Sequence, residues 1–226
     1  RASAPLVECR YLDRVTCVLV VALGFALGSI PFGVVIAKRR GVDIQQHGSG
    51  NIGATNVTRV LGKKWGRICF ALDFLKGFLP AFSVSILVGR GVVPGDWQLA
   101  LIAAIFGAVF GHVWSVFLKF KGGKGVATSA GAIIAVAPVP TVLSLLVWAV
   151  VFQASKYVSL ASICAAVFLP LSGFALSYFG VVPAPCAILL VLTLIAVLTV
   201  VKHKSNIRRL LDGTESRFTK GGGANA

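Results

Sequence analysis

The stretch Trp97–Leu118, WQLALIAAIFGAVFGHVWSVFL, contains no acidic residue, lysine or arginine along its 22 residues. About 20 consecutive apolar residues in an α-helix are long enough to cross the hydrocarbon core of a bilayer. The whole chain has this character, because 57% of its 226 residues are hydrophobic, only 13% are charged and its mean hydropathy is +0.89. A soluble domain exposes far more charge. Further apolar runs lie at about 15–37, 66–90, 126–137, 139–153, 157–179 and 184–201.

These runs predict an all-α fold, a polytopic bundle of about seven transmembrane helices. A membrane β-barrel is disfavoured because the runs are continuous, whereas residues in barrel strands alternate between lipid and lumen. The break at residues 137–140, Ala-Pro-Val-Pro, is a turn signal, and the runs on either side of it are short. For residues 126–153 the sequence therefore fits three structures: a helical hairpin, tilted partial spans or one long kinked helix.

The net charge of +15 is spread along the chain in a way that is typical of membrane topology signals and not of a nucleic-acid-binding surface. Basic residues lie beside the ends of the apolar runs, where they orient helices and contact anionic lipid. With seven passes, 17 of the 22 lysines and arginines fall on one side of the membrane. The positive-inside rule places that side in the cytoplasm, with the N-terminus outside and the C-terminus inside. We therefore expect contact with membrane lipid and none with nucleic acid.

One integral membrane domain is predicted over residues 15–218. Residues 1–14 are expected to form an external N-terminal segment, and residues 219–226, which end in GGGANA, a flexible tail. None of the five cysteines falls in a Cys-x-x-Cys or Cys/His metal spacing, so we expect them to be small apolar packing residues, with a Cys9–Cys17 bridge outside the cytoplasm as the open alternative. No metal site is predicted.

A polar, glycine-rich segment, Gly48–Arg59 (GSGNIGATNVTR), follows the first apolar run. Gly48, Gly50 and Gly53 allow positive φ and close approach to a ligand, and a helix starting near Ala54 would aim free amides at an anion. The segment matches the dinucleotide pattern G-x-G-x-x-G, but no βαβ unit surrounds it, so that function is rejected. The candidate ligand contacts are Ser49, Gly50, Asn51, Thr55 and Arg59, whose guanidinium suits phosphate.

A second basic segment, Phe120–Ser129 (FKGGKGVATS), follows the run at 97–118. It lacks the Walker A pattern, because Leu118 and Gly125 stand where that motif needs glycine and serine or threonine. ATP hydrolysis is therefore not supported, although a lysine after two glycines still suits a phosphate. The candidate contacts are Gly122, Gly123 and Lys124.

A third segment, Lys202–Glu215 (KHKSNIRRLLDGTE), places His203 and Asn206 on one helical face as the chain leaves the membrane. Ser159, near the predicted cytoplasmic end of its run, is a further candidate for substrate contact, although helix packing explains a small residue there equally well. Neither His112 nor His203 has a carboxylate at helical spacing to orient it, and no H-E-x-x-H pattern is present.

Asp73 and Lys76 lie three residues apart within an apolar run, so they share a helical face and are predicted to pair. Charges at membrane depth are costly unless they are paired or lie near an aqueous pocket. A structural ion pair that supports the site is favoured over direct catalysis. His112 is interpreted as a buried histidine of the bundle rather than as a base.

The chain closely resembles the bacterial membrane-integral acyl-phosphate:glycerol-3-phosphate acyltransferase family over about residues 15–218. The resemblance is carried by GSIPFG, GSGNIGATNVTR, LDFLKG, GHVWSVFLKFKGGKGVATS, KYVSLAS and KHKSNIRRLLDGTE. It implies transfer of a long-chain acyl group from acyl phosphate to the 1-hydroxyl of sn-glycerol 3-phosphate, the first acylation of phospholipid synthesis. Lysophosphatidic acid and phosphate would be the products. It also implies the bacterial cytoplasmic (inner) membrane, an active site on the cytoplasmic face, no cofactor, and a peripheral enzyme that makes acyl phosphate as upstream partner.

Both substrates of such an enzyme carry phosphate, so bringing them together requires cations and amide donors. Acyl phosphate is already activated, so positioning and charge neutralisation suffice without a strong protein base. A substrate phosphate is predicted to take the hydroxyl proton, with His203 as the rival base. The resemblance assigns phosphate and hydroxyl contacts to Ser49, Asn51, Thr55, Arg59, Lys124, Ser159, His203 and Asn206, of which Arg59, Lys124, His203 and Asn206 are the catalytic candidates.

Two other classes of function have weaker support in the sequence. A transporter of a phosphorylated metabolite would explain the anion-binding groups, but it predicts polar residues through both leaflets and usually two related halves. Here the polar segments share one predicted face, and the sequence shows no internal repeat. A non-catalytic membrane scaffold leaves the glycine-rich segments unexplained.

Overall fold

The computed structural model describes residues 4–92, 97–182 and 184–218, with side chains from residue 15 onward. Within these ranges every regular element is a helix, which confirms the all-α prediction. The chain divides into two compact units, each made of two separate stretches. Unit 1 is Arg1–Pro31 with Leu72–Val136, and unit 2 is Phe32–Ala71 with Ala137–Ala226.

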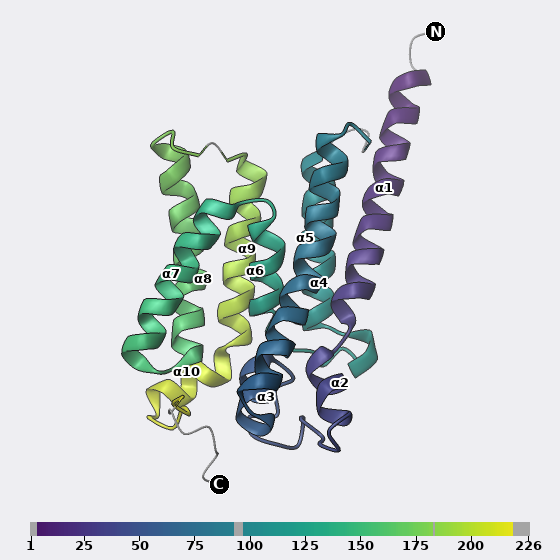
Figure 1. Cartoon of the computed structure of the whole chain (residues 1–226). Helices are drawn as coiled ribbons and strands as arrows, with labels where there is room; N and C mark the ends of the chain where they lie inside the picture. Colours follow the sequence, from purple (N-terminus) through teal and green to yellow (C-terminus); the bar gives the residue numbers. More distant parts are fainter. Residues whose placement is uncertain (1–3, 93–96, 183, 219–226) are drawn as a thin grey trace. The chain divides into compact units, whose positions relative to one another are not determined.

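Unit 1 contains two long helices, α1 (Ala4–Ser29) and α5 (Trp97–Val113), which lie side by side (Figure 1). Glycines permit this close packing. A Cβ at Gly28 would overlap the backbone of Ala108, and a Cβ at Gly111 would overlap the carbonyl of Phe25. The small residues therefore bring the two backbones into direct contact, as is common between membrane helices.

The helix α4 (Lys63–Gly89) begins in unit 2 and continues into unit 1, where the short helix α6 (Val126–Ile134) packs against it. A Cβ at Gly77 would overlap the carbonyl of Thr128, and a Cβ at Gly131 would overlap the carbonyl of Phe74. The 3-10 turn η1 (Val116–Leu118) and a glycine-rich loop connect α5 to α6.

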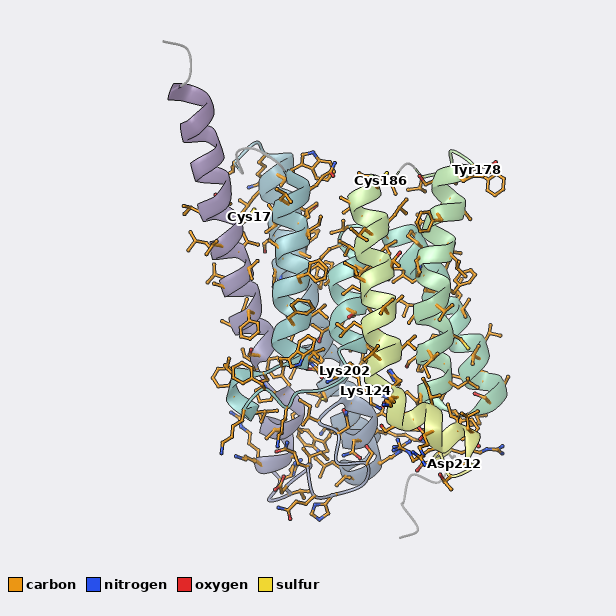
Figure 2. The ribbon with its side chains drawn as sticks, turned by 180° about the vertical axis from the view of Figure 1, so that it is seen from behind. Cys17, Lys124, Tyr178, Cys186, Lys202 and Asp212 are labelled. Atoms are coloured by element: carbon orange, nitrogen blue, oxygen red, sulfur yellow. The ribbon has the colours of Figure 1, made fainter. Side chains whose placement is uncertain are left out.

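In unit 2, the long helix α8 (Val158–Tyr178) packs against both α7 (Pro138–Ser155) and α9 (Cys186–Lys202) (Figure 1). Figure 2 shows Tyr178 and Cys186 at one end of this group and Lys202 and Asp212 at the other. The last helix follows a bend of 56°. The elements of unit 2 are α2 (Phe32–Lys38), α3 (Ala54–Leu61), the start of α4, α7 (Pro138–Ser155), α8 (Val158–Tyr178), α9 (Cys186–Lys202) and α10 (Lys204–Leu211).

Five helical stretches in the described part of the chain are long and apolar enough to cross a membrane, and α9 with α10 makes a sixth if the bent pair is one span. The predicted run at 126–137 forms only α6, whose nine residues rise about 14 Å, less than half of a bilayer core of about 30 Å. Residues 126–153 thus form two helices, α6 and α7. The seven passes and their orientation stay predictions.

The predicted segment boundary between residues 14 and 15 does not coincide with the end of a helix. Residues 4–14, expected to be an external segment, continue α1 without a break. Residues 219–226, expected to be a tail, lie outside the described residues. A single domain over 15–218 stays a prediction, since the two compact units are interleaved along the chain.

Candidate active site

One buried side chain, Asn56, shapes the glycine-rich loop of unit 2. Its Oδ1 accepts a hydrogen bond from the Ser49 amide at 2.9 Å, and its Nδ2 donates to the carbonyls of Ile44 and His47 at 3.2 and 2.9 Å. Gly48 has a φ of +60°, and a Cβ there would overlap Asn56 Oδ1. Glycine is therefore required at position 48 for both conformation and space.

The loop leads into α3 at Ala54, as predicted. Gly50 has a φ of +68°, but Gly53 has a φ of −78° and is the N-cap residue, so the prediction of positive φ is wrong for Gly53. Asn51 Oδ1 accepts a hydrogen bond from the Gly53 amide at 2.9 Å. The first amides of a helix have no partner within it, so those of Ala54 and Thr55 are directed out of the N-terminus of α3.

Arg59 lies in the second turn of α3 and is half-buried. Its guanidinium donates to the Ser216 carbonyl at 3.2 Å, which ties α3 to the segment that follows α10. Burial lowers the pKa of Arg59 below its ordinary value, while the nearby Glu215 carboxylate opposes this shift. The guanidinium stays protonated at neutral pH, and its partial burial strengthens its attraction for an anion.

Ser159 and Asn206 meet at a residue that the motifs did not assign to the site, Glu215. Ser159 Oγ and Asn206 Nδ2 donate to the same oxygen, Oε1, at 2.7 and 2.6 Å, and Arg209 Nε donates to Oε2 at 2.7 Å. Burial raises the pKa of the Glu215 carboxyl, but these hydrogen bonds outweigh it and hold the pKa below the ordinary value of 4.5. The carboxylate is thus ionised at neutral pH and fixes the rotamers of two predicted substrate contacts.

His203 lies at the bend between α9 and α10 and is 3% exposed. Its Nδ1 lies 2.8 Å from the Thr199 carbonyl. Only a protonated nitrogen makes this bond, so the neutral imidazole has its lone pair on Nε2. This tautomer is the one that a base acting through Nε2 needs.

A buried charge cluster lies at one end of unit 1, and it confirms the predicted Asp73–Lys76 pair at 2.8 Å. Lys76 Nζ also donates to the carbonyl of Ile30, just beyond α1, at 2.7 Å. The Asp73 oxygen lies 3.7 Å from His112 Nδ1. Helical spacing did not predict this contact, because Asp73 approaches His112 from another helix rather than along the same one.

The glycine-rich loop of unit 1 is folded against the end of α5. The amides of Gly122 and Gly123 donate to the carbonyls of Val113 and His112 at 3.2 and 3.1 Å. These bonds satisfy carbonyls that a helix end leaves without intrahelical partners. The two glycines therefore act on α5 through their amides, and substrate contact at these positions stays a prediction.

Lys124, labelled in Figure 2, is half-buried on the loop that enters α6. Gly125 follows with a φ of +79° and is the N-cap residue of α6. The Thr128 hydroxyl in the first turn is buried and has no hydrogen-bond partner among the described residues. A lysine, a helix N-terminus and a buried hydroxyl thus come together here, a combination that suits phosphate.

The predicted site residues are divided between the two units. Unit 2 brings Arg59, Ser159, His203 and Asn206 to the end marked by Lys202 and Asp212, while Lys124 belongs to unit 1. Within the described ranges, no group of three or more His, Cys, Asp or Glu side chains is arranged to hold a metal ion. The assignment of individual residues to substrates stays a prediction.

The chain matches the glycerol-3-phosphate acyltransferase family over residues 18–213. A glycerol-3-phosphate acyltransferase of Aquifex aeolicus (strain VF5) is 46% identical over 198 residues, which cover 88% of this chain and 97% of that protein. One of Desulforudis audaxviator (strain MP104C) is 44% identical over 210 residues, with coverage of 92% and 98%.

Two solved structures are similar as well. Both are crystal structures of PlsY (YgiH), an integral membrane glycerol 3-phosphate acyltransferase, and both are 45% identical to this chain. Its glycerol 3-phosphate form has a TM-score of 0.80, covering 90% of this chain and 96% of that one. Its lysophosphatidic acid form has a TM-score of 0.77, covering 90% and 95%.

Proposed function

The chain belongs to the glycerol-3-phosphate acyltransferase family, and we propose that it transfers a long-chain acyl group from acyl phosphate to the 1-hydroxyl of glycerol 3-phosphate. Lysophosphatidic acid and phosphate are the products. The forms in which PlsY has been crystallised support this acceptor and this product. Because the family consists of acyltransferases, neither a transporter nor a scaffold is retained as the function.

One observation carries the site assignment: unit 2 brings Arg59 of α3 close to the cluster around Glu215, at one end of its long helices. Cations and amides at the end of a helix bundle suit a phosphate head. The same helices expose apolar side chains along their length, such as Val150, Leu171 and Val197. The acyl chain of the donor can rest against such a surface.

In the proposed reaction, the acceptor hydroxyl oxygen attacks the acyl carbon. The ester C–O bond forms, the C–O bond to phosphate breaks, and the hydroxyl proton leaves with the phosphate. Phosphate is a good leaving group, so positioning of the substrates and neutralisation of their charge by basic side chains provide most of the acceleration. We assign the proton to a substrate phosphate oxygen, and His203 Nε2 is the rival base.

Membrane placement follows from charge. The 17 lysines and arginines on one predicted side favour a site that faces the cytoplasm from the bacterial inner membrane. A water-soluble enzyme at that surface is then the expected source of acyl phosphate, whose long chain partitions into the bilayer.

The test uses the purified full chain in detergent with palmitoyl phosphate. Phosphate release is expected only when glycerol 3-phosphate is also present, together with lysophosphatidic acid in equal amount. Palmitoyl-CoA replaces palmitoyl phosphate as the control donor. Phosphate release without the acceptor would indicate a hydrolase, and acylation from palmitoyl-CoA would overturn the proposed donor.

A further inference from the structure

We propose that His112 is the positioning residue for Lys124 and that the buried Asp73–Lys76 pair holds His112 in place. This inference rests on the proposed contact of Lys124 with a substrate phosphate. All four residues lie in unit 1.

The Asp73–Lys76 pair joins three helices at one end of this unit. Lys76 Nζ, on α4, lies 2.8 Å from Asp73 Oδ1 and 2.7 Å from the Ile30 carbonyl at the end of α1. The same Asp73 oxygen lies 3.7 Å from His112 Nδ1 in the last turn of α5. Apolar side chains would hold helices together without the desolvation cost of buried charges. Charges at membrane depth that persist despite this cost usually serve a function.

His112 contacts the lysine-bearing loop in two ways. Its backbone carbonyl accepts the Gly123 amide at 3.1 Å, and its Nε2 occupies the space where a Cβ at position 123 would stand. Gly123 is not among the described glycines with positive φ, so the imidazole, not the backbone conformation, excludes alanine there. The ring thus sets how closely the loop approaches α5, and Lys124 is the next residue.

The other side of the loop is anchored by the helix that carries the ion pair. Gly77 directly follows Lys76 and contacts the backbone of Thr128 on α6, and Gly131 contacts the backbone of Phe74. The helix α6 begins two residues after Lys124. Residues 73–77 therefore contact the elements at both ends of the short loop. Asp73 lies beside His112 before the loop, and Phe74 and Gly77 pack against α6 after it.

A histidine beside a carboxylate is also arranged as a general base. The geometry favours positioning, because the second ring nitrogen faces the backbone of Gly123. A positioning residue changes substrate affinity together with the approach of Lys124, whereas a base changes kcat.

The experiment combines Gly123→Ala with His112→Ala in the full-length enzyme and measures steady-state kinetics with each substrate varied. Lys124→Ala identifies the substrate whose KM depends on the lysine. Gly123→Ala alone is expected to raise that KM about tenfold with a smaller change in kcat. In the His112→Ala background the new methyl group has room, so Gly123→Ala should raise the KM by less than about a further threefold.

Gly122→Ala is the matched control. A Cβ there would overlap the backbone carbonyls of His112 and Val113, which truncation of the imidazole leaves in place. The increase in KM caused by Gly122→Ala should therefore be the same with and without His112→Ala. His112→Asn keeps a donor toward Asp73 but removes Nε2, and it is the second background if the alanine variant does not fold.

The inference is overturned if Gly123→Ala raises the KM equally in the wild-type and His112→Ala backgrounds. It is also overturned by a fall in kcat of more than about 100-fold at unchanged KM in the His112 variants, which would make the histidine a base. Unchanged KM values in Lys124→Ala overturn both the proposed contact and this inference. A raised KM in Lys124→Ala without one in the His112 variants overturns this inference alone.

Discussion

Replacing Glu215 by glutamine tests whether this carboxylate organises the end of unit 2. Glutamine keeps an oxygen for Ser159 and Asn206, but it puts an N–H where Oε2 accepts the hydrogen bond from Arg209 at 2.7 Å. A hydrogen bond to a charged group contributes about 1.5–3 kcal/mol. Because the Arg209 side chain is 39% exposed, we expect a loss of about 1–2 kcal/mol. For a chain of this size, that lowers the melting temperature by about 2–8 °C.

The assay is thermal unfolding of the full chain in detergent, followed by circular dichroism. Asp212→Asn is the matched control, because the Asp212 carboxylate is 57% exposed and lies 3.8 Å from the exposed Arg208. An exposed pair of this kind contributes little, so no shift is expected. An unchanged melting temperature in Glu215→Gln, or an equal drop in Asp212→Asn, would refute the reasoning.

The pH dependence of the same measurement adds a second arm. The native pKa of Glu215 lies below its ordinary value of 4.5, so the stabilisation is complete above that pH. It is lost as the pH falls from there through the lower native pKa. The difference in stability between the wild type and Glu215→Gln should therefore narrow only in this acid range. A difference that is constant down to the lowest accessible pH would contradict the assignment.

Three further predictions concern other parts of the chain. Arg59→Lys is expected to reduce kcat/KM by about 10- to 100-fold, because an ammonium group cannot bind phosphate as a planar fork; near-wild-type kinetics would remove Arg59 from the site. His203→Asn, which retains a side-chain donor but no base, is expected to keep kcat within about tenfold; loss of kcat with both substrates still bound would assign the proton to His203. Gly131→Ala is expected to lower the melting temperature by about 2–12 °C, since its methyl group would overlap the Phe74 carbonyl. Gly89→Ala, which meets no atom within 4 Å, is the control for the last of these, and an equal drop there would contradict the packing argument.

Features that depend on neighbours along the chain were predictable. The Asp73–Lys76 pair follows from a spacing of three residues on one helix, and the start of α3 at Ala54 follows from the glycines before it. The length of α6 was not predictable from hydropathy. Its apolar run continues past Ile134, but the helix ends there, before the prolines that begin α7.

The role of Glu215 shows where sequence reasoning stopped. Its only signal was its position as an acid at the end of a basic segment, and nothing in the spacing relates it to Ser159, which lies 56 residues earlier. The contact of Asp73 with His112 could not be predicted for the same reason, since the two residues lie on different helices and share no helical spacing. Side-chain groups that converge from different helices leave no periodic trace in the chain.

The amino-acid sequence by itself determined that this protein is an all-α membrane protein of the glycerol-3-phosphate acyltransferase family, because long apolar runs and uninterrupted motifs are properties of consecutive residues. Only the tertiary structure decided which groups hold the candidate contacts in place: Glu215 for Ser159 and Asn206, and His112 for the loop that carries Lys124. The physical reason is that hydropathy depends on each residue's transfer from water to lipid, whereas a hydrogen-bonded cluster depends on atoms that folding brings within about 3 Å of one another.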